Sequence, residues 1–211
     1  MTDANLKSDG RTGPPQTNDL MPGERTAISA SAFVPKLAAI RIADDTPTDD
    51  LLETVIRTLQ EEGSIVAGFI QRQGRQDQSG HAEMLLEEIP GGRQFCISQP
   101  LGKEARGCRL DPQAIADIAG PFLEAIESRP DLLVINRFGK GEAEGQGFRR
   151  VLEKAFILGI PVLTSVKDAY VDAWEAFAGD CAVSLPATLE NALQWSRTAV
   201  RSETAVRTAG S

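Results

Sequence analysis

A short group of polar residues follows an apolar run near the middle of the chain. The run covers 132–135, and it leads directly into Asn136, Arg137, Gly139, Lys140 and Glu142. In nucleotide-hydrolysing α/β proteins, a strand of this kind usually ends in an acid that serves the metal ion. Here that place holds Asn136, whose amide donates and accepts hydrogen bonds but cannot supply the charge that fixes magnesium.

Cationic side chains at predicted loop ends form a second candidate group. Arginine forks and a lysine ammonium bind small oxyanions such as molybdate, or phosphorylated ligands, and Lys140 is the foremost candidate for such a contact. Cys108 is a candidate thiol, because neighbouring arginines lower a cysteine pKa when they face it. The alternative is that these cations pair with surface carboxylates and that Cys108 is a packing residue. The candidate ligand-binding set is Asn136, Arg137, Gly139, Lys140, Glu142, Arg72, Arg75, Arg109 and Cys108.

The first predicted strand–helix turn, at 43–50, differs from a phosphate-binding loop. A P-loop needs G-x-x-x-x-G-K-[ST], whereas this turn reads ADDTPTDD, with four aspartates and neither glycine nor lysine. Asp44 and Asp45 are candidate ligands for a divalent metal, which would allow binding of a nucleotide with magnesium. Alternatively, they are solvated turn residues, while Asp49 and Asp50 favour the positive end of the helix that follows.

The charge distribution excludes some classes of partner. The net charge is −8, and the segment 37–195 carries −10 while the two ends sum to +2. An acidic core argues against nucleic acid, whose phosphates require a basic surface. His81 is the only histidine and there are three cysteines without a CxxC pair, so a zinc site or a Ser–His triad is not expected.

Two terminal segments differ from the rest of the chain. Residues 1–34 are rich in Gly, Pro, Ser, Thr, Asn and Asp, and we expect a disordered tail there and a second one at 199–211. A single domain is then predicted at 35–198. We expect a cytoplasmic protein without membrane insertion, because no signal-peptide pattern and no apolar run near 18 residues occurs.

Between the tails, apolar runs alternate with helical patterns. Thr48 and Asp111 are predicted N-caps, and Gly63 is a predicted helix end. Strands are predicted at 37–42, 64–70, 83–89, 93–98, 131–136, 160–166 and 181–185, and helices at 49–63, 111–128, 147–159, 169–179 and 188–199. The strands at 83–89 and 93–98 flank Pro-Gly-Gly and are typical of an antiparallel hairpin.

Alternation of this kind predicts an α/β domain of three layers with a mostly parallel sheet. Ligands of such open sheets bind beyond the carboxyl ends of the strands. The polar group at 136–142 lies at such an end, and so does the acidic turn at 43–50. The elements are therefore expected to bring the candidate residues to one edge.

The segments GSIVAGFIQRQGRQDQSGHAEMLLEEIPGG, GCRLD, DLLVINRFGKGEAEGQGF, GIPVLTSV and WEAF resemble a bacterial domain-of-unknown-function family, numbered twenty-four seventy-eight. The resemblance covers about 37–180. Members often occur near molybdate-transport or molybdenum-enzyme genes, and some are named as molybdenum transporter ATP-binding proteins. It implies a link to molybdenum, and transporter or molybdoenzyme components as partners.

A more distant resemblance is to small P-loop nucleoside triphosphatases of the thermophile and cancer-related type. Gly139, Lys140 and Glu142 keep that group's Gly-Lys-x-Glu spacing, while Asn136 and Arg137 replace its Asp and Glu. This resemblance implies a P-loop-hydrolase-like fold with a degenerate P-loop.

Three functions follow as hypotheses. The leading one is a non-catalytic ligand-binding or accessory protein that binds an oxyanion or a phosphorylated ligand. The second is a metal-dependent nucleotide phosphohydrolase that uses Asp44–Asp50. The third is a structural partner of a transporter or molybdoenzyme. A homodimer is compatible with each of them.

Overall fold

In the computed structural model, residues 34–43, 48–76, 82–99 and 109–209 are described, and they fall within one compact unit. The strands are β1 (Leu37–Ile42), β2 (Val66–Gln76), β3 (Ala82–Ile89), β4 (Gln94–Cys96), β5 (Leu132–Phe138), β6 (Val162–Lys167) and β7 (Ala182–Leu185). The α-helices are α1 (Asp49–Glu61), α2 (Pro112–Ala125), α3 (Lys140–Ala143), α4 (Arg149–Ile157), α5 (Val171–Ala178) and α6 (Leu189–Ala209).

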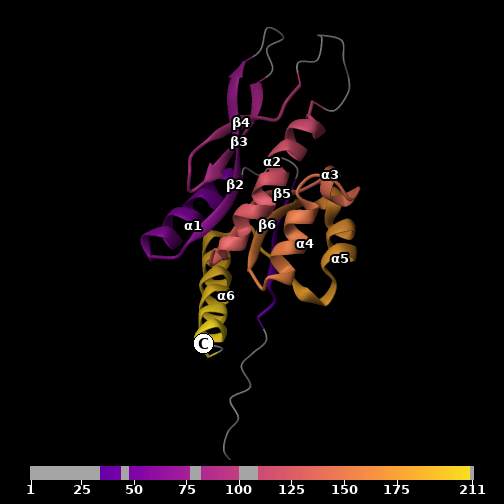
Figure 1. Ribbon diagram of the computed structural model, residues 1–211. Helices are drawn as coiled ribbons and strands as arrows, with labels where there is room; N and C mark the ends of the chain where they lie inside the picture. Colours follow the sequence, from indigo (N-terminus) through magenta and orange to yellow (C-terminus); the bar gives the residue numbers. More distant parts are fainter. Residues whose placement is uncertain (1–33, 44–47, 77–81, 100–108, 210–211) are drawn as a thin grey trace, which may run out of the picture. The chain divides into compact units, whose positions relative to one another are not determined.

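The described strands form one sheet in the order β4-β3-β2-β5-β6-β1-β7 (Figure 1). Strands β2, β5, β6, β1 and β7 pair in parallel, whereas β3 pairs antiparallel with both β2 and β4. The predicted mostly parallel sheet with an antiparallel hairpin is confirmed. Strand β2 is longer than predicted, because it continues to Gln76 opposite β3.

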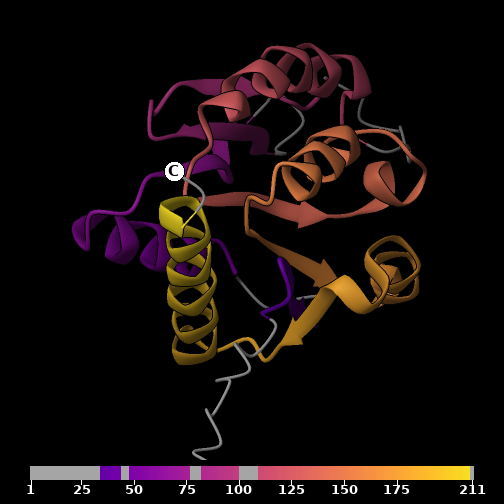
Figure 2. The ribbon, with the colours of Figure 1, turned by 60° about the horizontal axis from the view of Figure 1, so that its bottom comes forward.

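Helices cover both faces of the sheet. Helices α1 and α6 pack on one face, and α2, α4 and α5 pack on the other (Figure 2). The central strand β5 is buried on both faces, which explains why Leu132, Leu133 and Val134 are all apolar. The α/β three-layer prediction is therefore confirmed.

Gly68 allows β2 and β5 to approach each other closely. Its φ is +143°, and a Cβ atom there would lie 1.8 Å from the carbonyl oxygen of Val134. A larger residue would push apart the two strands that carry the candidate edge.

One predicted helix cap is present and another is absent. The Oδ1 atom of Asp111 accepts hydrogen bonds from the N–H groups of Gln113 and Ala114, at 2.9 and 3.2 Å. Thr48 also precedes its helix, but its side chain makes no capping hydrogen bond and is buried. Thr48 therefore occupies the predicted N-cap position, but its side chain does not cap the helix by a hydrogen bond.

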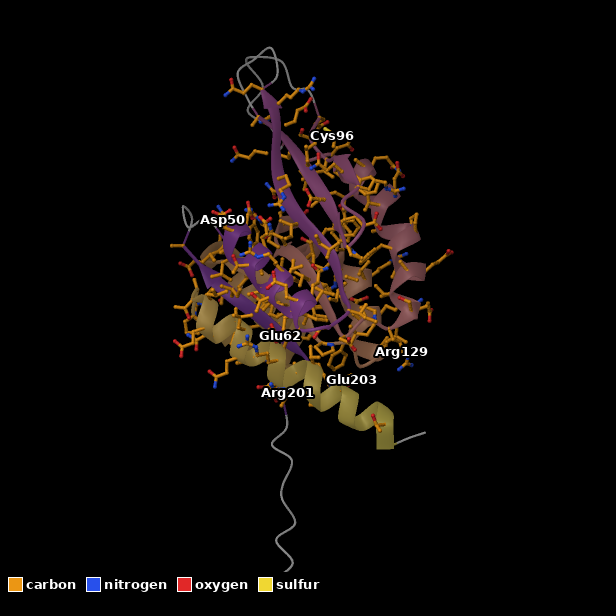
Figure 3. The ribbon with its side chains drawn as sticks, turned by 90° about the vertical axis from the view of Figure 1, so that its left-hand side faces the viewer. Asp50, Glu62, Cys96, Arg129, Arg201 and Glu203 are labelled. Carbon is orange, nitrogen blue, oxygen red and sulfur yellow. The ribbon has the colours of Figure 1, made fainter. Side chains whose placement is uncertain are left out.

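Helix α6 extends beyond the predicted domain boundary at 198. The helix continues to Ala209, so the tail predicted from 199 is wrong over that range. Two contacts explain the extension: Ala199 is fully buried, and the buried Glu203 lies 2.5 Å from the Nζ of Lys36. Figure 3 shows Glu203 on α6 and Glu62 at the end of α1, where Glu62 pairs with Arg197. The N-terminal tail predicted at 1–34 lies almost wholly outside the described residues.

Candidate functional site

The end of β5 contacts the start of α1 through Asn136. Its side-chain amide donates a 2.5 Å hydrogen bond to Oδ1 of Asp49, and its Oδ1 accepts a 3.3 Å hydrogen bond from the hydroxyl of Ser165. Asn136 is only 5% exposed. The amide at the place of the metal-serving acid is therefore used to join β5, β6 and α1 inside the protein.

Glu142 organises the segment that follows β5. One carboxylate oxygen accepts from the N–H of Gly139 at 3.0 Å, and the other accepts from the N–H of Phe148 at 2.9 Å. Gly147 has a φ of +61°, and a Cβ atom there would lie 2.3 Å from Oε1 of Glu142. The glycine therefore makes room for the buried carboxylate. We name residues 139–148 the Lys140 loop.

Aromatic side chains anchor both ends of this loop. Phe138 packs edge-on against Trp174 and stacks with Phe177, with ring centroids 5.3 and 5.6 Å apart. The guanidinium of Arg149 lies 4.6 Å from the centre of the Phe177 ring. The Lys140 loop is thus tied to α5 as well as to its own hydrogen bonds.

Lys140 and Arg137 differ in exposure. The Lys140 side chain is 63% exposed, and its ammonium lies 3.8 Å from Glu144. Arg137 is half-buried, and its Nε has no hydrogen-bond partner among the described residues. Lys140 is consequently free to turn from Glu144 towards a ligand, because an exposed pair at this distance contributes little.

Two predicted ligand residues lie on the β2–β3 hairpin, apart from the Lys140 loop in sequence. Arg72 binds Glu53 at 2.6 Å and Glu87 at 3.3 Å, and its hydrogen bond to Glu53 raises the pKa of its guanidinium. The same hydrogen bond lowers the pKa of Glu53, while bonds from Gln94 and then Arg72 lower that of Glu87. Arg75 is exposed near the end of β2.

Of the other predicted ligand and metal-binding residues, only Arg109 lies within the described residues. Arg109 donates a 3.1 Å hydrogen bond to the carbonyl of Ala82. Cys108 and the candidate metal ligands Asp44 and Asp45 lie outside the described residues. Within the described ranges, no group of three or more His, Cys, Asp or Glu side chains is arranged to hold a metal ion.

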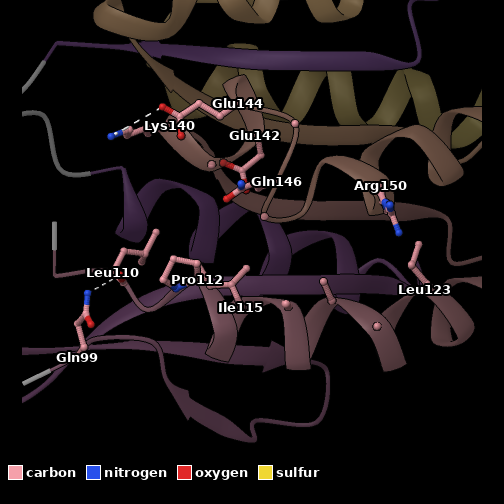
Figure 4. A pocket seen from close by; sticks show the side chains of 16 residues that line it. Gln99, Leu110, Pro112, Ile115, Leu123, Lys140, Glu142, Glu144, Gln146 and Arg150 are labelled. Carbon is pink, nitrogen blue, oxygen red and sulfur yellow. Dashed lines mark hydrogen bonds and ion pairs between the residues drawn. The ribbon is translucent and has the colours of Figure 1, made fainter.

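A pocket of about 560 Å³ lies between α2 and the Lys140 loop. Figure 4 shows Lys140 and Leu110 on opposite walls towards one end, and Arg150 and Leu123 towards the other. Its lining residues are Gln99, Leu110, Pro112, Ile115, Ala116, Ala119, Gly120, Leu123, Lys140, Gly141, Glu142, Glu144, Gly145, Gln146, Gly147 and Arg150.

Sequence reasoning selected Lys140 and Glu142 but missed the α2 wall and Arg150. The available signal was weak. Ala116 and Gly120 are small residues on an exposed helix face, and such a face forms a wall only when another element lies opposite.

None of the helices in the described part of the chain is both long enough and apolar enough to cross a membrane.

The fold and one sequence relative agree with the two resemblances. A human cancer-related nucleoside triphosphatase structure matches with a TM-score of 0.51 and 18% identity, over 82% of this chain and 96% of that one. The likeness shows that this chain shares the fold of that protein. A protein of Bradyrhizobium diazoefficiens, described as "Molybdenum import ATP-binding protein ModC 2", is 35% identical over 150 residues. That match spans 71% of this chain but only 17% of the relative.

The family comparison covers most of the described domain. Residues 37–195 match the model described as "Protein of unknown function (DUF2478)". This range contains the sheet edge, the Lys140 loop and the α2 wall of the pocket. The chain belongs to the DUF2478 family.

Proposed function

We propose that this chain is a non-catalytic accessory protein that binds a small oxyanion or a phosphorylated ligand at the Lys140 loop. The observation that carries the proposal is the 2.5 Å hydrogen bond between Asn136 and Asp49. It joins the end of β5 directly to the first turn of α1. In a P-loop hydrolase, these two places serve the metal ion and the phosphates.

The charge at the start of α1 also argues against hydrolysis. Asp49 and Asp50 occupy the first turn of the helix, where a P-loop hydrolase has lysine followed by serine or threonine. Two carboxylates at this place repel a triphosphate unless a metal ion intervenes. The Asn136 amide offers no charge to hold such an ion.

The Lys140 loop has the properties of a ligand-binding segment. Glu142 fixes its backbone, while Lys140 remains exposed and weakly paired on the pocket side. A fixed backbone with a free ammonium lowers the ordering cost of binding an anion. Arg137 is a second candidate contact, because its Nε lacks a partner among the described residues.

The link to molybdenum rests on the relative. That protein is described as a molybdenum import ATP-binding protein, and it shares 35% identity with this chain over 150 residues. We infer that this chain works in the cytoplasm with a molybdate transporter or molybdoenzyme component. Molybdate is the first oxyanion to test.

Titration calorimetry tests the binding site. Molybdate, tungstate, sulfate and phosphate are titrated into the wild type, Lys140→Ala, Arg137→Ala and the control Arg57→Ala, which removes an exposed cation from α1. We expect Lys140→Ala to weaken oxyanion binding about tenfold, and Arg57→Ala to leave it unchanged. Tight binding that is unchanged in both Lys140→Ala and Arg137→Ala contradicts the site.

A phosphate-release assay tests the absence of catalysis. We expect no turnover of ATP or GTP with magnesium. Magnesium-dependent release that is lost in Asp44→Asn or Asp45→Asn establishes the hydrolase alternative instead.

A further inference from the structure

The pocket between α2 and the Lys140 loop is larger than a bare oxyanion requires. Its volume is about 560 Å³. A tetrahedral oxyanion occupies on the order of 100 Å³, if each oxygen takes roughly the volume of a water molecule. Pockets for small organic ligands cover about 300–1,000 Å³, so the volume fits an organic molecule that carries an anionic group.

The two walls favour a flat molecule. The α2 wall protrudes little into the pocket, because Ala116, Ala119 and Gly120 have small side chains or none. Ile115 lies beside them. The opposite wall includes the backbone of Gly141 and Gly147, together with the side chains of Glu142 and Gln146. We name the space between α2 and the backbone of these glycines the slot, and an aromatic ring placed there would contact both walls.

The polar groups lie around this slot. Lys140 is near one end and Arg150 near the other, as Figure 4 shows. Arg150 is exposed and has no ion-pair partner among the described residues. A guanidinium binds adjacent ring acceptors through paired N–H groups, as arginine does with O6 and N7 of guanine.

The two carboxylates that line the pocket, Glu142 and Glu144, repel a bound anion to different degrees. Both oxygens of Glu142 already accept backbone N–H groups. Glu144 is 57% exposed, and its pairing with Lys140 at 3.8 Å is readily replaced. An anionic group can therefore take the place of Glu144 at Lys140.

We propose that this pocket binds a phosphorylated heteroaromatic compound of the purine-nucleotide type, with the ring between α2 and the loop glycines. The phosphate contacts Lys140, and Arg150 contacts acceptor atoms of the ring. This inference rests on the proposed function and deepens it, because it names the class of ligand held by the Lys140 loop. The slot is built from α2 and residues 140–150, whereas a P-loop would lie between β1 and α1.

The test uses the full chain and four probes. Inosine 5′-monophosphate contains both halves of the expected ligand, ribose 5-phosphate lacks the ring, inosine lacks the phosphate, and molybdate is a bare oxyanion. We expect inosine 5′-monophosphate to bind at least about tenfold more tightly than each of the other three. Ribose 5-phosphate binding as tightly as the nucleotide would overturn the proposal.

Two pairs of variants locate the contacts. Ala116→Phe fills the slot, and its control Ala125→Phe changes an exposed α2 position outside the pocket. Arg150→Gln removes the ring contact, and its control Arg57→Gln removes an exposed charge on α1. We expect each pocket variant to weaken nucleotide binding about tenfold, and each control to change it less than about twofold.

The probes also separate the two halves of the site. Arg150→Gln should weaken inosine 5′-monophosphate binding but not ribose 5-phosphate binding, whereas Lys140→Ala should weaken both. Nucleotide binding that is unchanged in both Ala116→Phe and Arg150→Gln overturns the pocket assignment. Ala116→Phe must match Ala125→Phe in circular dichroism, and Arg150→Gln supplies the independent test if it does not.

Failure of this inference is distinguishable from failure of the proposed function. Molybdate binding that depends on Lys140, without nucleotide binding, rejects the heteroaromatic ligand and retains the oxyanion site. Nucleotide hydrolysis with magnesium rejects the non-catalytic function even if the slot variants weaken binding. Binding of none of the probes rejects both.

Discussion

At the residue scale, Asn136 and Glu142 fix the structure of the candidate edge through buried hydrogen bonds. Each is a buried polar side chain whose oxygen atoms accept hydrogen bonds from the protein itself. Buried polar groups are tolerated when they are paired in this way, and removing a partner leaves a costly unsatisfied group. These two residues therefore shape the site, and Lys140 remains available to contact a ligand.

Glu142→Gln should destabilise the protein by about 2 kcal/mol, because one oxygen becomes an NH₂ group facing a backbone N–H donor. Glu144→Gln is the matched control, since Glu144 is exposed and should change stability by less than about 0.5 kcal/mol. Urea unfolding measures both. Equal stabilities of the two variants would show that the Glu142 bonds do not hold the loop.

Asn136→Asp should destabilise the protein at neutral pH, because the new carboxylate would face Asp49 across a 2.5 Å contact. The pKa of the introduced carboxyl is raised in the folded state, so its cost is present above the unfolded pKa and disappears as the pH falls. The expected loss is about 1–3 kcal/mol at pH 7.

The double variant Asn136→Asp with Asp49→Asn reverses the polarity of the contact and should recover most of that stability. Thermal unfolding at pH 5 and pH 8 measures the effect. A single variant as stable as the wild type at both values would exclude the Asn136–Asp49 contact.

At the element scale, α6 and the β2–β3 hairpin both extend beyond their predicted ends. Helix α6 is held to the start of β1 by Lys36 and Glu203, and β2 is held to β3 and α1 by Arg72. Such ion pairs join residues that are distant in sequence. Local patterns cannot show them, and this explains why the predicted ends were too early.

Glu203→Gln should destabilise the protein by about 1–2 kcal/mol, because it leaves Lys36 partly buried without its charged partner. Glu190→Gln, at an exposed position in the first turn of α6, is the control. Hydrogen exchange should show faster exchange of the amides of α6 in the first variant alone. Equal exchange rates in the two variants would argue against a stabilising contact between Lys36 and Glu203.

The Arg72 network should make stability depend on acid pH. The pKa values of Glu53 and Glu87 are lowered from 4.5, so their contribution is present above pH 4.5 and is lost as the pH falls below it. The Arg72→Met variant should therefore lose less stability between pH 5 and pH 3 than the wild type. Parallel pH profiles for the two proteins would contradict this.

At the scale of the whole molecule, hydrophobic patterning alone predicted the layers and the mostly parallel sheet. Buried strands such as 132–135 are apolar throughout, and that signal is visible without a structure. The candidate site was only partly predictable. The sequence indicated Lys140 and Glu142, but it could not show that Asn136 reaches Asp49 or that Ala116 faces the glycines of the loop.

In the proposed function, the protein binds an anionic ligand through Lys140 and does not hydrolyse a nucleotide. One thermal-shift experiment compares the wild type, Lys140→Ala and Arg57→Ala with molybdate, tungstate, phosphate, and ATP with magnesium. A ligand at a hundred times its dissociation constant stabilises by about 2.7 kcal/mol, which is a shift of several degrees. We predict an oxyanion shift in the wild type and Arg57→Ala that is lost in Lys140→Ala. A shift only with ATP and magnesium, unchanged in Lys140→Ala, would contradict the account.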